Sequence, residues 1–181
     1  MKGVSVEVVT KSGASCSDVE FGFFVSCVRA SGEVSLQNLG ERIRSAPALV
    51  FARADSSVLA VAALKNPAPS YRRRVGTECG TPLPSESLPF ELGWVYVFPE
   101  ARRRGHSLLV TQAALTAACG AGVFATSRTD NEPMHRSLTK LGFIEHGKAF
   151  QSGRGSHFIK VFVRHAAQQT IPADRPKTGS G

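Results

Sequence analysis

The chain has 181 residues, of which 42% are hydrophobic, and a formal net charge of +8. This length suits one domain around a single core and is short for two. No stretch approaches the roughly 20 consecutive apolar residues of a transmembrane helix, and Glu7 interrupts the apolar run near the N-terminus, which excludes a signal-peptide core there. These features predict a cytoplasmic protein that does not enter a membrane.

Much of the positive charge lies in two runs of three arginines, at residues 72–74 and 102–104. A basic surface gains affinity for nucleic acid by releasing counterions from the phosphates, so nucleic acid is one candidate partner. The first run is interpreted as part of a solvated loop. The four cysteines are scattered, without the spacing of a metal site or a disulfide framework, and no metal is expected.

The first third of the chain alternates between strand and helix patterns. Valines alternate with polar residues at its start, which is the period of a half-buried strand. Apolar residues then recur at helical spacing, and two runs of apolar residues flank a short polar turn. The predicted elements are a strand at 4–9, helices at Asp18–Ala30 and 35–44, and a hairpin of strands at 48–54 and 58–64.

Residues 66–89 contain five prolines, two glycines and several serines, a composition that predicts an extended loop. Loops of this length within compact domains are uncommon and often serve as lids or binding loops. Tyr71 and the first arginine run lie in this segment, so it is interpreted either as a functional lid or as a mobile insertion.

The segment that follows predicts a strand, a crossover helix and a second strand. Phe90, Leu92, Trp94, Tyr96 and Phe98 alternate with other residues and are expected to share one side of the first strand. The helix is expected over residues 105–119 and the second strand over residues 123–127. A unit of this kind is normally parallel and right-handed.

The remaining residues predict a short helix, a hairpin and a tail. Asp130 is a candidate N-cap for the helix, which ends at Gly142. The hairpin is expected from strands at 144–150 and 157–164. Residues 166–181 are rich in polar residues, proline and glycine, and are predicted to form a disordered tail.

Three arginines and a glycine between a strand and a helix have the chemistry of an anion site. The first amides of a helix lack internal partners, and the helix dipole places partial positive charge there, so a phosphate can accept several backbone hydrogen bonds. Gly105 would let the backbone approach the phosphate closely, and the arginines would supply charge.

Two segments of this region resemble the signature segments of the GNAT superfamily of N-acetyltransferases. The family pattern of Gln or Arg, two residues, Gly, one residue and then Gly or Ala is matched by Arg102, Gly105 and Ser107, with serine as a departure. In the family a helix also runs from an asparagine to a Gly-Phe pair twelve residues later, as from Asn131 to Phe143 here.

The resemblance implies a fold of the α/β (α+β) class. In this fold a single domain, here residues 1–165, has a central mixed, mostly antiparallel twisted sheet of about six or seven strands, flanked by about four helices. A splayed pair of parallel strands holds the acyl-CoA. It also implies acetyl-CoA contacts from the backbone of Val97 and from the second segment through Asn131. The amides around the pyrophosphate would be those of Arg102, Arg103, Arg104, Gly105, His106 and Ser107.

The resemblance also suggests where the chemistry takes place. Many family members carry a catalytic carboxylate near the start of the strand before the arginine turn, and Glu91 stands at that place. A tyrosine seven residues after the asparagine protonates the leaving thiolate in much of the family, but that position here is Leu138. Ser137 and Tyr96 are the candidate substitutes, and water is a further one.

The predicted function is therefore an acetyl-CoA-dependent N-acetyltransferase that acts on a primary amine by direct attack in a ternary complex. The acceptor is either a small molecule or a protein amino group, and the scarcity of acids at residues 66–89 disfavours a polycation. The alternative is a non-catalytic module that binds coenzyme A or nucleic acid and has a regulatory role. A homodimer is compatible with both.

Overall fold

The computed structural model describes residues 5–32 and 34–167 of the chain. They form one eight-stranded sheet in the order β1-β2-β3-β4-β5-β8-β6, with β7 paired to β8. All neighbouring strands are antiparallel except β4 and β5, which are parallel. The predicted tail at residues 166–181 lies, apart from its first two residues, outside the described residues.

The strands and helices follow the predicted order, with one added helix and with two short strands, β6 and β7, in place of the single strand expected at 144–150. The strands are β1 Val6–Lys11, β2 Ala48–Ala54, β3 Ser57–Lys65, β4 Phe90–Val97, β5 Val123–Arg128, β6 Ile144–Glu145, β7 Phe150–Gln151 and β8 Phe158–Arg164. The helices are α1 Asp18–Ala30, α2 Leu39–Arg44, α3 Pro69–Cys79, α4 His106–Thr116 and α5 Glu132–Lys140, with 3-10 turns at Gly13–Ser15 and Pro99–Ala101. Within the described ranges, no helix combines the length and the apolar character that crossing a membrane requires.

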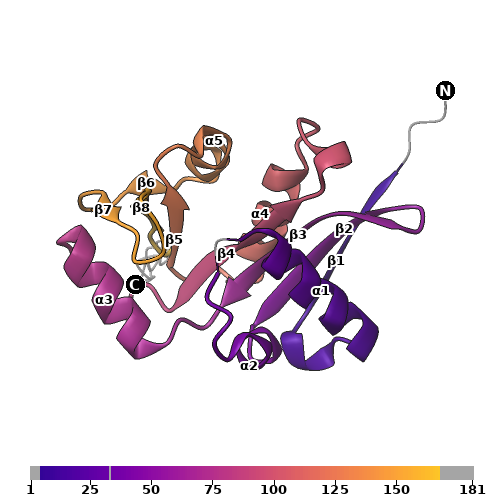
Figure 1. The fold of residues 1–181 in the computed structure, drawn as a ribbon, viewed down its shortest axis with the longest axis horizontal. Coiled ribbons are helices and arrows are strands. Elements are labelled where there is room, and N and C mark those ends of the chain that lie inside the picture. The colour runs from indigo at the N-terminus through magenta and orange to yellow at the C-terminus, as the bar shows by residue number, and fades with distance from the viewer. Residues whose placement is uncertain (1–4, 33, 168–181) are drawn as a thin grey trace, which may run out of the picture.

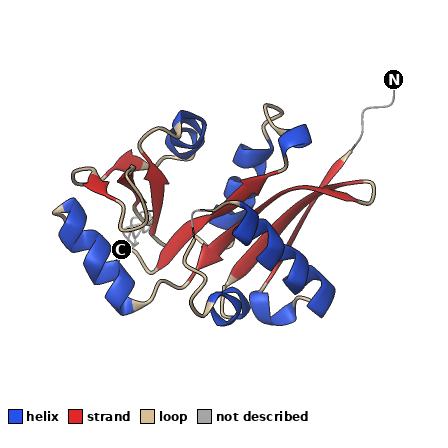
Figure 2. Cartoon of the chain, viewed as in Figure 1, coloured by secondary structure: helices blue, strands red, loops and turns tan. Residues whose placement is uncertain are grey.

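Helices cover both faces of the sheet (Figures 1 and 2). On one face, α4 and α5 pack over β2 to β5 and β8 through a core that includes Leu92, Val110 and Leu138. On the other face, α1 and α2 cover β2 to β4, and α3 covers β5 and β8. The second face therefore carries two separate cores, and the junction of β4 and β5 lies between them.

A capping box fixes the start of α1. The Ser17 hydroxyl accepts from the Glu20 amide while the Glu20 carboxylate accepts from the Ser17 amide, so two otherwise unpaired donors are satisfied. The same carboxylate pairs with Lys11 of β1 at 2.8 Å and with Arg53 of β2 at 3.2 Å. The hydrogen bond from Lys11, with that from the Ser17 amide, lowers the pKa of Glu20 to about 2.

The parallel pair of strands separates after three residues. Phe90, Glu91 and Leu92 pair with Val123, Phe124 and Ala125, but β4 continues to Val97 and β5 to Arg128. Beyond the pairing, the facing edges of the two strands present backbone groups that have no partner in the opposite strand. The predicted splayed pair is therefore present.

A bulge in β4 overturns the predicted alternation of its aromatic residues. The register against β3 shifts between Val61 and Ala63, and Trp94 has a φ of 49°. Because a bulge adds one residue to a strand, the side chains after it change faces. Leu92 packs under α4, whereas Trp94, together with Tyr96 and Phe98, packs on the α1 and α2 side.

The expected loop at residues 66–89 contains a helix instead. Pro69 occupies the first helical position, where its missing amide costs nothing, and Gly80 ends the helix with a φ of 75°. Val75 and Cys79 face the core over β5 and β8. The prediction was wrong because the prolines of this segment lie outside the interior of the helix.

Candidate active site

The turn between β4 and α4 has the backbone shape of an anion site. Its residues Arg103 and Gly105 have φ angles of 63° and 82°, and Gly105 is the N-cap of α4. A Cβ atom built on Gly105 would meet no atom within 4 Å, so the space beside this backbone is open. The first amides of α4 have no partner within the helix, so they are available to an anion that enters beside Gly105.

The arginines of this turn are all exposed. Arg102 turns back toward β4, and its Nε donates to the carbonyl of Val97 at 3.2 Å. The buried Ala101 anchors the preceding 3-10 turn in the core. A hollow of about 390 Å³ adjoins the turn, formed by Arg104, Gly105 and the first residues of α4 with Val6 of β1.

The second signature segment lies against this helix. Ser107 Oγ is 3.9 Å from the sulfur of Met134, which joins the start of α4 to α5. Asn131 is the N-cap of α5, and its side-chain oxygen accepts from the Met134 amide at 3.3 Å. Asp130, the predicted cap, pairs with Arg128 at 2.8 Å instead. His106 is buried at the start of α4.

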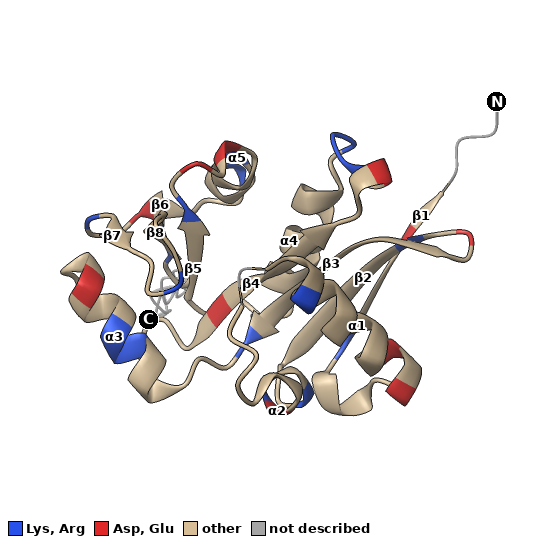
Figure 3. Ribbon diagram, in the orientation of Figure 1, with Lys and Arg blue, Asp and Glu red and all other residues tan. Residues whose placement is uncertain are grey.

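Glu91 is buried where β4 and β5 begin to separate, with 3% of its surface exposed. Its Oε2 is 2.9 Å from Nζ of Lys65, the last residue of β3. Its Oε1 accepts from the Tyr71 hydroxyl at 2.9 Å and from Thr126 Oγ1 at 3.4 Å. Figure 3 shows the acidic segment of β4 beside the start of β5. Three elements besides β4 thus hold this carboxylate.

Tyr71 is a site residue to which the sequence assigned no role. It lies on α3, and its hydroxyl is also 3.5 Å from Thr126 Oγ1. Burial and the charge of Glu91 raise the pKa of Tyr71 well above its usual value, so its hydroxyl stays protonated and donates to the carboxylate. Residues 66–89 were interpreted either as a functional lid or as a mobile insertion, and no pattern in them linked Tyr71 to Glu91.

The candidate acids are placed away from Glu91. Ser137 Oγ donates to the Pro133 carbonyl at 3.1 Å, within α5. The Tyr96 ring packs edge-on against Phe98, with 5.1 Å between ring centroids. Leu138 is fully buried in the core beneath α5. The groups bonded to Glu91 are therefore Lys65, Tyr71 and Thr126, and neither candidate acid is among them.

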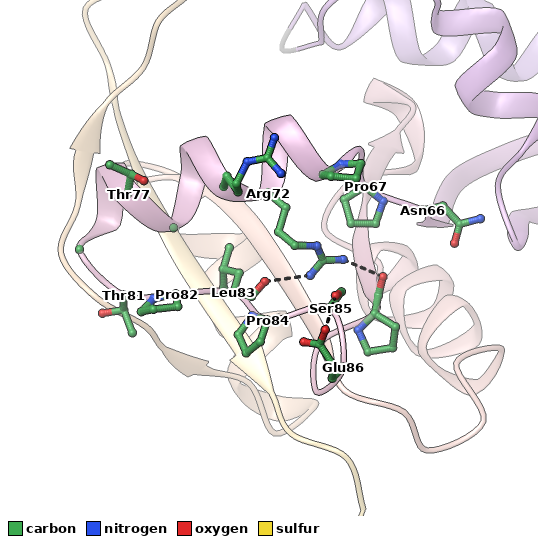
Figure 4. Close-up of a pocket in the computed structure, with 15 residues that line it drawn as sticks. Asn66, Pro67, Arg72, Thr77, Thr81, Pro82, Leu83, Pro84, Ser85 and Glu86 are labelled. Atoms are coloured by element: carbon green, nitrogen blue, oxygen red, sulfur yellow. Dashed lines mark hydrogen bonds between the residues drawn. The ribbon is translucent and has the colours of Figure 1, made fainter.

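Arg72 is a structural residue, contrary to the interpretation of the first arginine run as a solvated loop. Its guanidinium donates to the carbonyls of Leu83, Leu88 and Pro89, and it lies 5.3 Å from the centre of the Phe124 ring. Figure 4 shows it crossing a cavity of about 840 Å³ between α3 and residues 80–89. Arg74 pairs with Glu78 at 2.9 Å. Arg73 and Arg74 are exposed, whereas Arg72 is buried.

The possible metal-binding side chains of the described residues do not form a metal site. In the part of the chain that the structure describes, no three His, Cys, Asp or Glu side chains are grouped so that they could hold an ion.

Comparisons with known proteins match the fold rather than the sequence. No protein-family model matches the chain, and no curated protein does. An acyl-CoA N-acyltransferase from Pseudomonas aeruginosa matches with a TM-score of 0.60 and 16% identity, over 88% of this chain and 99% of that chain. Arabidopsis thaliana NAA60 in complex with acetyl-CoA matches with a TM-score of 0.62 and 11% identity, over 89% and 98% of the two chains.

A third matching structure is described as a member of the GNAT family. A GNAT-family protein from Desulfovibrio desulfuricans matches with a TM-score of 0.59 and 14% identity, over 90% of this chain and all of that chain. The strand order, the parallel β4–β5 pair and these matches together identify the fold of the chain as that of the GNAT acetyltransferases.

Proposed function

We propose that this chain, which has the GNAT fold, is an N-acetyltransferase that moves an acetyl group from acetyl-CoA to a primary amine. The observation that carries the proposal is that β4 connects two features. The carboxylate of Glu91 is buried at its start, in the segment paired with β5, and its end leads into the Gly105 turn that opens α4.

The donor would lie along the separated edges of β4 and β5. The amides from Arg102 to Ser107 would bind its pyrophosphate, because the first amides of a helix and the arginine charges both favour an anion. The backbone of Val97 would pair with the pantetheine arm, and Asn131 would lie beside it. The space beside the Gly105 backbone is open, and glycine leaves it open because it has no Cβ atom. A phosphate could therefore approach this backbone closely.

The amine would attack the thioester directly. A lysine-like amine with a pKa of about 10.4 is mostly protonated at neutral pH, which is a handicap of about 4 to 5 kcal/mol that a base must offset. Glu91 would first take this proton, directly or through water, which frees the lone pair of the nitrogen. The nitrogen would then attack the carbonyl and form the C–N bond, and the C–S bond would break. The nitrogen loses its second proton as the departing thiolate takes one up. Tyr71, Lys65 and Thr126 would hold the carboxylate in position.

One observation supports a second candidate function. Leu138 is fully buried at the position of the usual acid, and Ser137 and Tyr96 are bonded or packed elsewhere. A chain that binds coenzyme A without turnover, as a regulatory module, would need no acid. In the enzyme, water or Ser137 would protonate the departing thiolate.

Thermal unfolding with acetyl-CoA tests the donor site. At a concentration about 100 times the Kd, a ligand that binds only the folded state adds about 2.7 kcal/mol, which raises the Tm of a chain of this size by roughly 5–10 °C. The double variant Arg102→Glu, Gly105→Glu should lose this shift, because it places two acids at the anion site.

The matched control is Arg29→Glu with Gly22→Glu. Both residues are exposed on α1, and a Cβ on Gly22 meets no atom within 4 Å, so this pair has the same charge change away from the turn. The control should keep the shift. A parent protein whose Tm does not respond to acetyl-CoA would overturn the proposal, and thiol release across a panel of amines then separates an enzyme from a binding module.

A further inference from the structure

We infer that the amine acceptor carries a carboxylate, as an amino acid does, and that Arg42 binds it. This inference rests on the proposed acetyl transfer and names the class of its second substrate. It starts from the charges that surround Glu91 on the face of the sheet between α2 and α3.

Two cations contact the same indole ring beside the splay. The ring of Trp94, at the bulge of β4, lies 5.8 Å from the guanidinium of Arg42 and 5.1 Å from Nζ of Lys65. Lys65 is paired with Glu91, so its charge is already offset. Arg42, at the end of α2, adds a positive charge next to the carboxylate that would serve as base.

The hydrogen bonding of Arg42 is incomplete. Its Nη2 donates to the carbonyl of Ser35, but Nε is buried and has no hydrogen-bond partner among the residues that the structure describes. A buried charged donor without an acceptor costs free energy that a ligand can recover. A carboxylate matches a guanidinium in shape and charge, and can accept two parallel hydrogen bonds from it.

A further cation acts on Arg42. Burial lowers the pKa of Arg42 below its usual value, the charge of Arg154 in the β7–β8 turn lowers it further, and Glu91 and Tyr71 oppose this effect. The groups that influence Arg42 thus include a second arginine, from the far side of the splay, as well as the proposed base.

The positive charge of Arg42 favours some classes of acceptor over others. A polyamine or a lysine side chain would bring a further positive charge toward Arg42 and offer no acceptor to its unpaired Nε. An amine that bears its own carboxylate would bring a negative charge to Arg42 and its nitrogen toward Glu91. The same geometry therefore disfavours cations and favours a zwitterion.

The test uses matched acceptors that differ only in the acidic group. Turnover is measured as thiol release from acetyl-CoA, with α-amino acids, their α-amides and the corresponding decarboxylated amines. We expect kcat/KM to be at least 10-fold higher for the amino acids than for their amides. Arg42→Gln should reduce this ratio about 10-fold, mainly by raising KM for the amino acids, and Arg42→Lys should restore part of it.

Arg53→Gln is the matched control. Arg53, on β2, also has a buried Nε with no hydrogen-bond partner among the described residues, but its guanidinium pairs with Glu20 of α1. It should leave the ratio unchanged. Amides or decarboxylated amines used as well as the amino acids would overturn the inference and leave acetyl transfer standing. Absence of turnover with every amine, despite a thermal shift with acetyl-CoA, would overturn the transfer reaction and this inference together.

Discussion

At the scale of single residues, the site depends on how one carboxylate is held. Glu91 is bonded by Lys65 of β3, Tyr71 of α3 and Thr126 of β5, so it can move little without breaking contacts to three elements. A base that is fixed in this way would meet the amine without reorganisation, which is how positioned groups lower a barrier.

Replacement of Glu91 by Gln should lower kcat by roughly 10²–10⁴-fold at neutral pH, the usual contribution of a general base. The loss should shrink as the pH rises toward the pKa of the acceptor, because more of the amine is then already unprotonated. Rates measured from pH 7 to 10 test this. Glu145→Gln, on an exposed ion pair with Lys160, is the control and should leave the profile unchanged.

A loss that stays constant across this pH range would contradict a role for Glu91 as base and indicate a structural role. Tyr71→Phe separates positioning from proton transfer further. It keeps the ring and removes one hydrogen bond to the carboxylate, so kcat should fall less than in Glu91→Gln while acetyl-CoA binding is retained.

The sequence predicted the positions of Glu91 and Asn131 but not their neighbours. Glu91 follows from its place at the start of a strand, and Asn131 from its spacing to Gly142 and Phe143. Lys65, Tyr71 and Thr126 reach Glu91 through the packing of three separate elements, and no local sequence pattern predicts these contacts. The predicted cap was displaced by one residue because Asp130 has an arginine partner.

At the scale of elements, the composition of residues 66–89 predicted a loop where the structure has the helix α3. Three prolines of the segment, Pro82, Pro84 and Pro89, follow the helix, in the loop whose carbonyls accept hydrogen bonds from Arg72. Arg72 joins the helix to this loop from the inside, so the helix and the loop support each other. This dependence on tertiary contacts explains why the helix is not evident from propensity alone.

Arg72→Met should destabilise the fold, because it keeps much of the packing but leaves the carbonyls of Leu83, Leu88 and Pro89 without this donor. We expect a loss of about 2–4 kcal/mol in the free energy of unfolding, measured in urea. Arg73→Met removes an exposed arginine from the same helix and should change it by less than about 0.5 kcal/mol. Equal effects would show that Arg72 does not anchor the loop.

At the scale of the molecule, the sheet consists of two parts joined along a short seam. One part is β1 to β4 and the other is β5 with β8, β6 and β7, and three residue pairs of β4 and β5 connect them. The order of the elements and the parallel seam were predictable from the strand, helix, strand pattern. The bulge at Trp94 was not, because nothing in an alternating aromatic strand indicates where an extra residue is accommodated.

Ligand binding across the separated strands should slow amide hydrogen exchange most at the residues that the ligand contacts. Acetyl-CoA would offer hydrogen-bond partners to the free edges of β4 and β5 and to the first amides of α4, so amide hydrogen exchange should slow at residues 93–109 and 126–134. Residues 18–30, in α1 on the other face of the sheet, should slow less, because they gain only the stabilisation of the whole fold that ligand binding brings. Mass spectrometry of peptides from both regions measures the difference.

The Arg102→Glu, Gly105→Glu variant is the control for this experiment. Because it removes binding at the turn, it should show no slowing at either set of residues under the same concentration of acetyl-CoA. Slowing that is spread evenly over the sheet would point to general stabilisation of the fold. Slowing confined to residues 66–89 would instead place the ligand in the cavity beneath α3, where Arg72 lies, and the donor site would have to be assigned there.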